Sequence, residues 1–394
     1  MRSCRQAASP SLPRRRWLPL GVIALGGILA APPAEALLTF PHRDNDGADQ
    51  IIVTGAYSIG YDTNVFAQRA NKKAAYTQLL TAGASYTRRA GLISVDAGFS
   101  MNAGSFAGLP GQNYTDPAFT LGFTKGSGRT TGTLDFSAAK SNAPDPVAND
   151  RAIAWNYSAV QGLRYPLIDR YFFTNSATVG GTSYQNQKLF ANQVAYSDAF
   201  QVNVIYDSKL SFDTGYHFAL AQTHDTNNWT HNFTFGAVGN IIPNVTGSID
   251  LGYAYDLSKT RHQKENDYQS FTGDANLIWH FSRVLSFSGI AAKSFGISST
   301  NVVTNTTSAG ITASGNVGKR FRTDLGVNGN WTAFLSPNGL GRRDTLLELT
   351  ADLGTALTTH LRLNLNYTYM ENYSNISTGK FIRETITLTL LATY

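Results

Sequence analysis

The sequence has very little cysteine and, after its first residues, no long apolar stretch. One of the 394 residues is cysteine, Cys4, so the chain lacks the pairs that disulfides and thiolate metal sites need. From residue 37 onward there is no run of about 18–20 apolar residues, which excludes a membrane-spanning helix. Lysine, glutamate and methionine are scarce, whereas glycine, aromatic residues, threonine, asparagine and serine are abundant. This composition disfavours helices and favours strands joined by turns.

The formal net charge of +6 is concentrated at the N-terminus. Residues 1–36 hold five arginines and one glutamate, and removing these from the 32 basic and 26 acidic residues leaves 27 against 25. A balance this close to neutral, with no basic cluster among aromatic residues, gives no reason to expect nucleic acid as a partner.

The first 36 residues have the pattern of a secretory signal peptide. A basic segment that includes three arginines at 14–16 precedes a short apolar segment at 18–31, and an Ala-Glu-Ala sequence at 34–36 supplies small residues for cleavage. Residues 37–49 follow as a short periplasmic lead-in. We therefore expect an exported chain whose folded part is 50–394.

The strongest pattern is a strict alternation of apolar and polar residues. Between residues 382 and 394, isoleucine, leucine and tyrosine share one parity while arginine and threonine mostly hold the other. A strand with one apolar face requires this pattern. Similar runs occupy 212–220, 245–256, 322–331 and 361–369. They last about 10–14 residues, longer than the roughly 5–6 usual in soluble sandwiches and close to the length that crosses a bilayer.

The links between these runs alternate in predicted length. Tight links lie near 88–91, 126–128, 166–169, 207–209, 242–244, 282–283, 319–320 and 357–360. Longer polar links lie near 62–75, 102–116, 140–151, 184–195, 222–230, 257–267, 297–306, 336–343 and 374–380. These links join 18 strands, with 16 as the alternative count. Short turns on one rim and long loops on the other are typical of outer-membrane barrels.

The predicted fold is therefore an all-β, transmembrane, antiparallel up-and-down β-barrel in the outer membrane of a Gram-negative bacterium. It has short periplasmic turns, longer extracellular loops and both barrel termini on the periplasmic rim. Membrane lipid and lipopolysaccharide would surround it. A soluble multi-strand β protein is the competing fold.

The segment Gly60-Tyr-Asp-Thr-Asn-Val-Phe66 resembles an element of the putative β-barrel porin 2 family, Asp-Ser/Thr-Asn-Val-Phe after the first strand. The resemblance implies a porin-type barrel, in some members encoded near exopolysaccharide genes. Its four marked residues are Asp62, Asn64, Val65 and Phe66. Asp and Asn favour turns, and the apolar pair can anchor the loop, so we interpret the segment as a latch near the seam between the first and last strands rather than as a ligand site.

Charged residues recur on the parity opposite the apolar face. Several follow an Asp-x-Gly-apolar pattern, as in Asp250-Leu-Gly-Tyr253. The predicted lumen charges are Asp96, Asp135, Asp213, Asp250, Asp274, Asp324, Asp352, Arg322, Arg362 and Arg383. One interpretation is a belt of carboxylates in the periplasmic half that favours cations; the other is that these carboxylates pair with the arginines.

The last residues match the signal by which barrels engage their insertion machinery. Leu388, Leu390 and Tyr394 share one parity, and an aromatic residue ends the chain. Tyrosine stands where phenylalanine is commoner.

No motif predicts a chemical step, a cofactor or a metal. The histidines form no His-Glu-x-x-His cluster; His224, Asp225 and His231 are the nearest approach to a metal set. Gly126-Ser-Gly128 is a turn, because no helical pattern follows it. A barrel hydrolase with a scattered Ser/His/Asp set remains an alternative without a motif.

The predicted function is passive diffusion of small polar solutes or ions through a porin-like channel. The alternatives are an accessory or exit barrel for exopolysaccharide and a plugged structural or adhesive barrel at the cell surface.

Overall fold

The structure is a computed structural model that describes residues 49–89, 91–145, 147–148, 150–261, 265–318, 320–335 and 341–394. The predicted signal peptide at 1–36 and nearly all of the lead-in at 37–49 lie outside the described residues. Within the described residues, no helix is long and apolar enough to cross a membrane.

Eighteen antiparallel strands form one sheet that closes on itself. The first nine are β1 (Gln50–Asp62), β2 (Ala75–Arg88), β3 (Ser94–Phe106), β4 (Tyr114–Lys125), β5 (Thr131–Asp145), β6 (Asp150–Ile168), β7 (Tyr171–Tyr184), β8 (Gln193–Ile205) and β9 (Leu210–Gln222). The others are β10 (Thr226–Ile242), β11 (Val245–Thr260), β12 (Asn266–Trp279), β13 (Leu285–Ile297), β14 (Val303–Val317), β15 (Phe321–Phe334), β16 (Arg343–Ala356), β17 (Leu361–Ser374) and β18 (Phe381–Thr393). Short 3-10 turns lie at η1 (Pro110–Gln112) and η2 (Ser377–Gly379).

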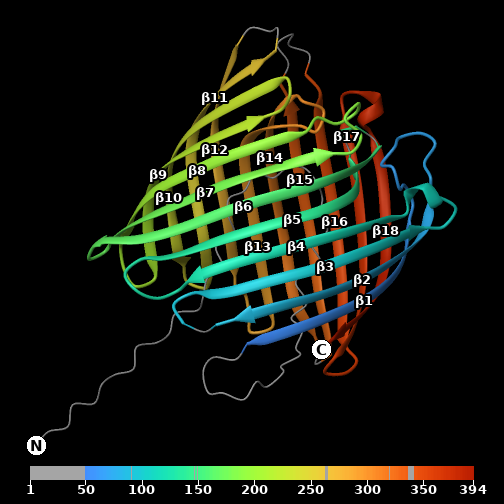
Figure 1. The fold of residues 1–394 in the computed structure, drawn as a ribbon, viewed down its shortest axis with the longest axis horizontal. Helices are drawn as coiled ribbons and strands as arrows, with labels where there is room; N and C mark the ends of the chain where they lie inside the picture. The colour runs from blue at the N-terminus through green and yellow to red at the C-terminus, as the bar shows by residue number, and fades with distance from the viewer. Residues whose placement is uncertain are drawn as a thin grey trace, which may run out of the picture.

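Each strand pairs with its neighbours in chain order, and β1 pairs with β18 from Thr54↔Thr393 to Asp62↔Thr385. The predicted all-β barrel of 18 strands is confirmed. In Figure 1 the blue and green strands cross in front of the orange and red strands at a steep angle, as the tilt of a closed barrel requires. Closure gives every strand a partner on both sides along at least part of its length, as a barrel in lipid needs.

The barrel has two unlike rims. The turn rim carries the start of β1, the end of β18 and links such as 169–170 and 243–244, where Asn244 has φ 63, a left-handed conformation that asparagine tolerates. The loop rim carries the other nine links, the longest being 63–74. Because the number of strands is even, the first residue of β1 and the last residue of β18 lie on the same rim.

The predicted long links are mostly shorter in the structure. Residues 140–145 belong to β5, and β9 and β10 are separated by 223–225 alone, where a link at 222–230 was expected. The prediction used polarity to end the strands and was wrong there, because backbone pairing continues through polar residues: Asn227 pairs with Lys259 and Asn142 with Ile153.

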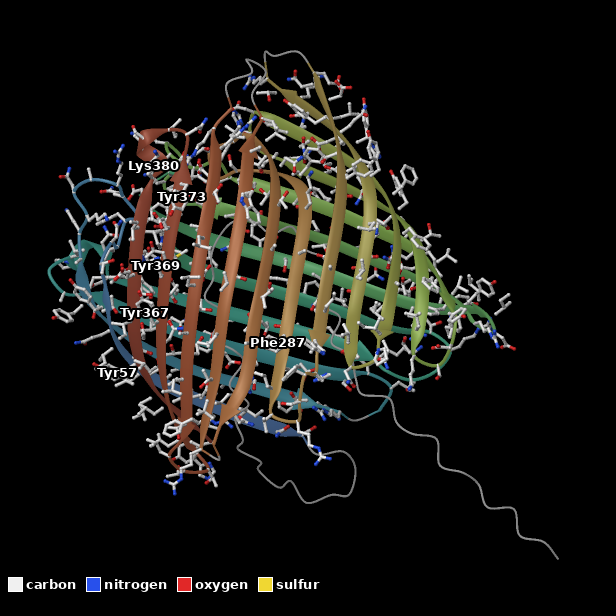
Figure 2. All side chains as sticks on the ribbon, turned by 180° about the vertical axis from the view of Figure 1, so that it is seen from behind. Tyr57, Phe287, Tyr367, Tyr369, Tyr373 and Lys380 are labelled. Carbon is white, nitrogen blue, oxygen red and sulfur yellow. The ribbon has the colours of Figure 1, made fainter. Side chains whose placement is uncertain are left out.

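The outer wall is apolar along its middle and aromatic toward both ends. Leu251, Phe271 and Ile311 are exposed on it, as lipid contact requires. Figure 2 labels Tyr367, Tyr369 and Tyr373, which follow one another along β17 toward the loop rim. The Tyr369 hydroxyl donates to Glu371 Oε2 at 2.7 Å, so the outer wall becomes polar near this rim. At the turn rim, Trp279 contacts Phe281 and Phe287, and Tyr394 stacks on His360.

Candidate functional site

The candidate site is the lumen, whose inner wall carries the predicted aspartates. Exposed apolar residues lie beside several of these aspartates in sequence, for example Leu134 and Phe136 around Asp135 and Leu251 after Asp250, and Asp213 and Asp274 share the face of Asp250 through the register. Because successive side chains of a strand point to opposite faces, the aspartates face inward. At mid-height the inward-facing Ile290 is 51% exposed, so there is solvent-accessible space beside it on the inner wall.

Strand register gathers these aspartates into three groups rather than a continuous belt. Asp96 and Asp135 both pair with Gly122 of β4, from opposite sides. Asp324 lies opposite Asp352, which accepts a hydrogen bond from Asn366 Nδ2 at 2.7 Å. The remaining group, formed by Asp213, Asp250 and Asp274, lies on β9, β11 and β12. None of the predicted aspartates lies on β6, β7 or β8.

The three predicted arginines differ in their surroundings. Arg322 Nε lies 3.4 Å from Asp324 Oδ2, with an arginine side chain that is 72% exposed. Arg383 Nη2 lies 2.8 Å from Asp62 Oδ2 in a pair that is largely buried. Arg362 is exposed at the turn-rim end of β17, and within the described chain it has no ion-pair partner.

The segment that resembles the porin family lies at the seam between β1 and β18. Asn64 Nδ2 donates to Ile382 O at 2.9 Å and to Gln68 O at 2.7 Å. Thr63 N donates to Glu384 O at 3.0 Å, while Glu384 N donates to Thr63 Oγ1 at 2.8 Å. These bonds extend the pairing of β1 with β18 beyond the last residue of β1.

The apolar half of this segment packs inside the loop rim. Val65 is fully buried and contacts Ala75 and Phe106, with Phe66 packed against the same cluster. Asp62 Oδ1 accepts from Asn64 N at 2.9 Å, so its carboxylate joins the turn to Arg383. The contacts are those of a seam latch, and we propose that role for Asp62, Asn64, Val65 and Phe66.

The β5–β6 hairpin leaves the wall and leans into the mouth of the barrel. β5 pairs with β4 only up to Ala139, and β6 pairs with β7 only from Ala154 onward, so residues 140–145 and 150–153 form a separate two-stranded ribbon. In this ribbon, the Arg151 Cζ atom lies 4.6 Å from the ring centroid of Phe106, which faces inward.

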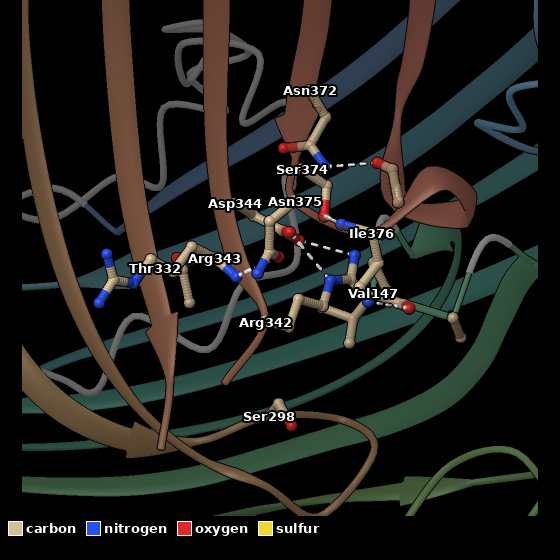
Figure 3. A network of polar contacts seen from close by, with 12 residues as sticks. Val147, Ser298, Thr332, Arg342, Arg343, Asp344, Asn372, Ser374, Asn375 and Ile376 are labelled. Atoms are coloured by element: carbon tan, nitrogen blue, oxygen red, sulfur yellow. Dashed lines mark hydrogen bonds and ion pairs between the residues drawn. The ribbon is translucent and has the colours of Figure 1, made fainter. Parts of the chain in front are cut away.

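The tip of the hairpin reaches the opposite side of the barrel. Arg342 Nη1, in the link before β16, donates to Val147 O at 2.7 Å, although the two links lie on nearly opposite sides of the strand order. Figure 3 shows Val147 beside Arg342, whose guanidinium also contacts Asp344. We call residues 140–153 the mouth hairpin.

A second bridge crosses the mouth through the link 298–302. Ala191 N donates to Ser299 O and Gln193 Nε2 to Ser298 O, each at 2.8 Å. Thr223 Oγ1 donates to Asn301 Oδ1 at 2.5 Å. The link after β13 therefore contacts those after β7 and β9, and the loop rim is narrowed from several sides.

Sequence reasoning missed the residues that make these bridges. Arg151 and Arg342 carry no local motif, because Arg151 contacts Phe106 and Arg342 donates to Val147, both far away in the sequence. Asp344 is part of the site only through Arg342. The hairpin lies mostly within the predicted link at 140–151, and Asp150-Arg-Ala-Ile153 does not alternate, so no local signal marked it.

The histidines that the structure describes lie apart from one another or have other partners. His231 Nδ1 shares a hydrogen bond with the Tyr216 hydroxyl at 2.7 Å on the outer wall, while His224 Nε2 lies 3.9 Å from Asp225 Oδ1. Across the residues that the structure describes, no three or more His, Cys, Asp or Glu side chains gather as metal ligands.

The C-terminal residues close the turn rim. Leu388, Leu390 and Tyr394 are exposed on the outer wall, and Tyr394 exchanges backbone hydrogen bonds with Val53 at 3.1 and 2.9 Å. An aromatic terminus that is exposed beside the seam is available to the insertion machinery, which we propose as its partner.

Solved structures similar to this chain have low sequence identity to it. The outer membrane protein opdK from Pseudomonas aeruginosa is 10% identical, with 87% of this chain and 99% of that chain covered and a TM-score of 0.48. The FrpB iron transporter from Neisseria meningitidis (F3-3 variant) is 7% identical, with coverages of 88% and 81% and a TM-score of 0.45. At TM-scores below 0.5 these structures say nothing about what this protein transports. The barrel fold is established by the strand pairing instead.

A search of curated proteins finds no match to this sequence. Residues 231–394 match the family model described as Putative beta-barrel porin 2. This is the family that the Gly60–Phe66 segment resembles, and the match lies in a different part of the chain. The protein is thus an outer-membrane β-barrel whose residues 231–394 match the porin family Putative beta-barrel porin 2.

Proposed function

We propose that the protein is a channel for passive diffusion of small polar solutes or ions. The observation that carries this proposal is a closed 18-strand barrel whose inner wall is lined with aspartates below a mouth narrowed by loops. Barrels of 16–18 strands leave an aqueous channel. Size selection would take place at the mouth hairpin, and charge selection at the aspartates. No chemical step is part of this function.

The proposed orientation has the turn rim in the periplasm and the loop rim outside the cell. Both sheet ends then lie on the periplasmic side, beside the exposed Tyr394. The mouth hairpin would face solutes arriving from the exterior. Proteolysis of intact cells, with cleavage at 63–74 but not at 357–360, would support this orientation, and the reverse pattern would reject it.

Replacing Asp213, Asp250 and Asp324 with asparagine should reduce cation preference. Rings or groups of carboxylates set the selectivity of cation pores, and these three lie on the inner wall. The reversal potential in a planar bilayer under a salt gradient measures the change. Asp267→Asn on the outer wall is the matched control, because it removes a carboxylate that does not face the lumen. An unchanged reversal potential in the triple variant contradicts charge selection.

A plugged barrel is the second candidate, and the bridges across the loop rim favour it. The mouth hairpin contacts the opposite link, and the link 298–302 contacts two others. A refolded protein without single-channel current would support the plugged barrel over the channel.

A further inference from the structure

Among the described residues, no lysine or arginine neutralises the Asp213, Asp250 and Asp274 group. Asp62, Asp116, Asp324 and Asp344 each have a lysine or arginine nitrogen within 4.0 Å. The described residues give the three grouped carboxylates no such partner. Like charges that share a site are unfavourable unless a proton or a cation joins them.

Two of these carboxylates converge over a glycine. Asp213 and Asp250 flank Gly236 of β10 in the register, so their side chains lie on either side of it on the lumen face. A Cβ atom added at Gly236 would lie 2.9 Å from both Asp213 oxygens and closer still to Asp250 Oδ1. Three carboxylate oxygens therefore gather on the lumen side of Gly236, in space that only glycine leaves free.

These carboxylate oxygens of Asp213 and Asp250 have almost no hydrogen-bond donors. Asp250 Oδ1 is buried and has no hydrogen-bond partner in the described chain. The Asp213 side chain is only 7% exposed, and its described donor, Gln201 Nε2, is 3.5 Å from Oδ1. Buried polar atoms nearly always have partners, so the arrangement lacks a positively charged or donating group.

We propose that Asp213 and Asp250 bind a hard divalent cation on the lumen side of Gly236. Such cations take oxygen ligands, and Mg²⁺ in particular is held by one or two carboxylates while it keeps several waters. The two carboxylates would supply the protein ligands and the lumen would supply the waters. Asp274, opposite Asp250 in the register, adds a further negative charge beside the site.

The inference deepens the proposed function, since the cation would reach the site through the lumen. It identifies a place where permeating divalent cations pause. It also gives Gly236 a role, because the absence of a side chain there leaves room for the cation.

Calcium and magnesium titrations of the refolded barrel in detergent test the site by calorimetry. The native protein and Gly289→Ala should bind about one divalent ion, because a Cβ atom at Gly289 of β13 meets nothing within 4 Å. Gly236→Ala keeps every charge but fills the space between the oxygens, so binding should weaken at least about tenfold. Asp250→Asn, which is nearly isosteric, should have the same effect and decides the matter if Gly236→Ala does not fold.

Two results overturn the site. One is the absence of saturable binding to the native protein, in which case Asp213 and Asp250 share a proton instead. The other is a folded Gly236→Ala or Asp250→Asn barrel that binds as tightly as the native one. If the barrel binds the divalent cation but passes no single-channel current, the cation site stands and the proposed channel is rejected. If it passes current but does not bind the cation, only the cation site is rejected.

Discussion

Replacing Arg383 with leucine is expected to destabilise the barrel by about 3–5 kcal/mol. Arg383 pairs with Asp62, whose side chain is nearly buried, and makes three hydrogen bonds to it of 2.8–3.2 Å. Removing the guanidinium leaves an unpaired buried carboxylate at the seam where β1 meets β18. Since this seam closes the sheet, the loss should appear in the free energy of unfolding in urea.

Arg322→Leu is the matched control for this substitution. Its partner Asp324 also faces the lumen, but the Arg322 side chain is 72% exposed, and exposed pairs contribute about 0–1 kcal/mol. The two variants should therefore differ by several-fold in their effect on unfolding. Equal effects would mean that the seam pair does not stabilise closure.

Shortening the mouth hairpin is expected to raise single-channel conductance several-fold. An Asn-Gly turn in place of 143–152 would join the paired residues Asn142 and Ile153 in the geometry that two-residue hairpins favour. It would remove both the Arg342 contact to Val147 and the Arg151 contact to Phe106. Planar-bilayer recording measures the result.

The control places the same Asn-Gly turn at 243–244 on the turn rim, where no hairpin crosses the lumen. Its conductance should equal that of the native barrel. A shortened hairpin with native conductance would show that the narrowest point lies elsewhere.

The sequence predicted the barrel because its main signal is local. Alternation along each strand fixes which residues face lipid, and in β18 it separates Leu388 and Leu390 from Thr387 and Thr389. The same parity placed Asp213, Asp250 and Asp324 on the inner wall. Strand number followed from counting the turns.

The mouth could not be predicted in this way. Arg342 and Val147 are 195 residues apart, and no local pattern links them. Register between neighbouring strands was also unknown, so the sequence could not show that Asp213 and Asp250 meet over Gly236 while Asp96 and Asp135 flank Gly122. The expected belt became three groups for that reason.

Single-channel recording of the refolded native barrel under a salt gradient is the most direct test of the channel. We predict discrete conductance steps and a reversal potential that favours cations, because aspartates line the lumen and, among the described residues, the Asp213, Asp250 and Asp274 group has no basic partner. A barrel that shows heat-modifiable migration, and is therefore folded, but passes no current would contradict the channel.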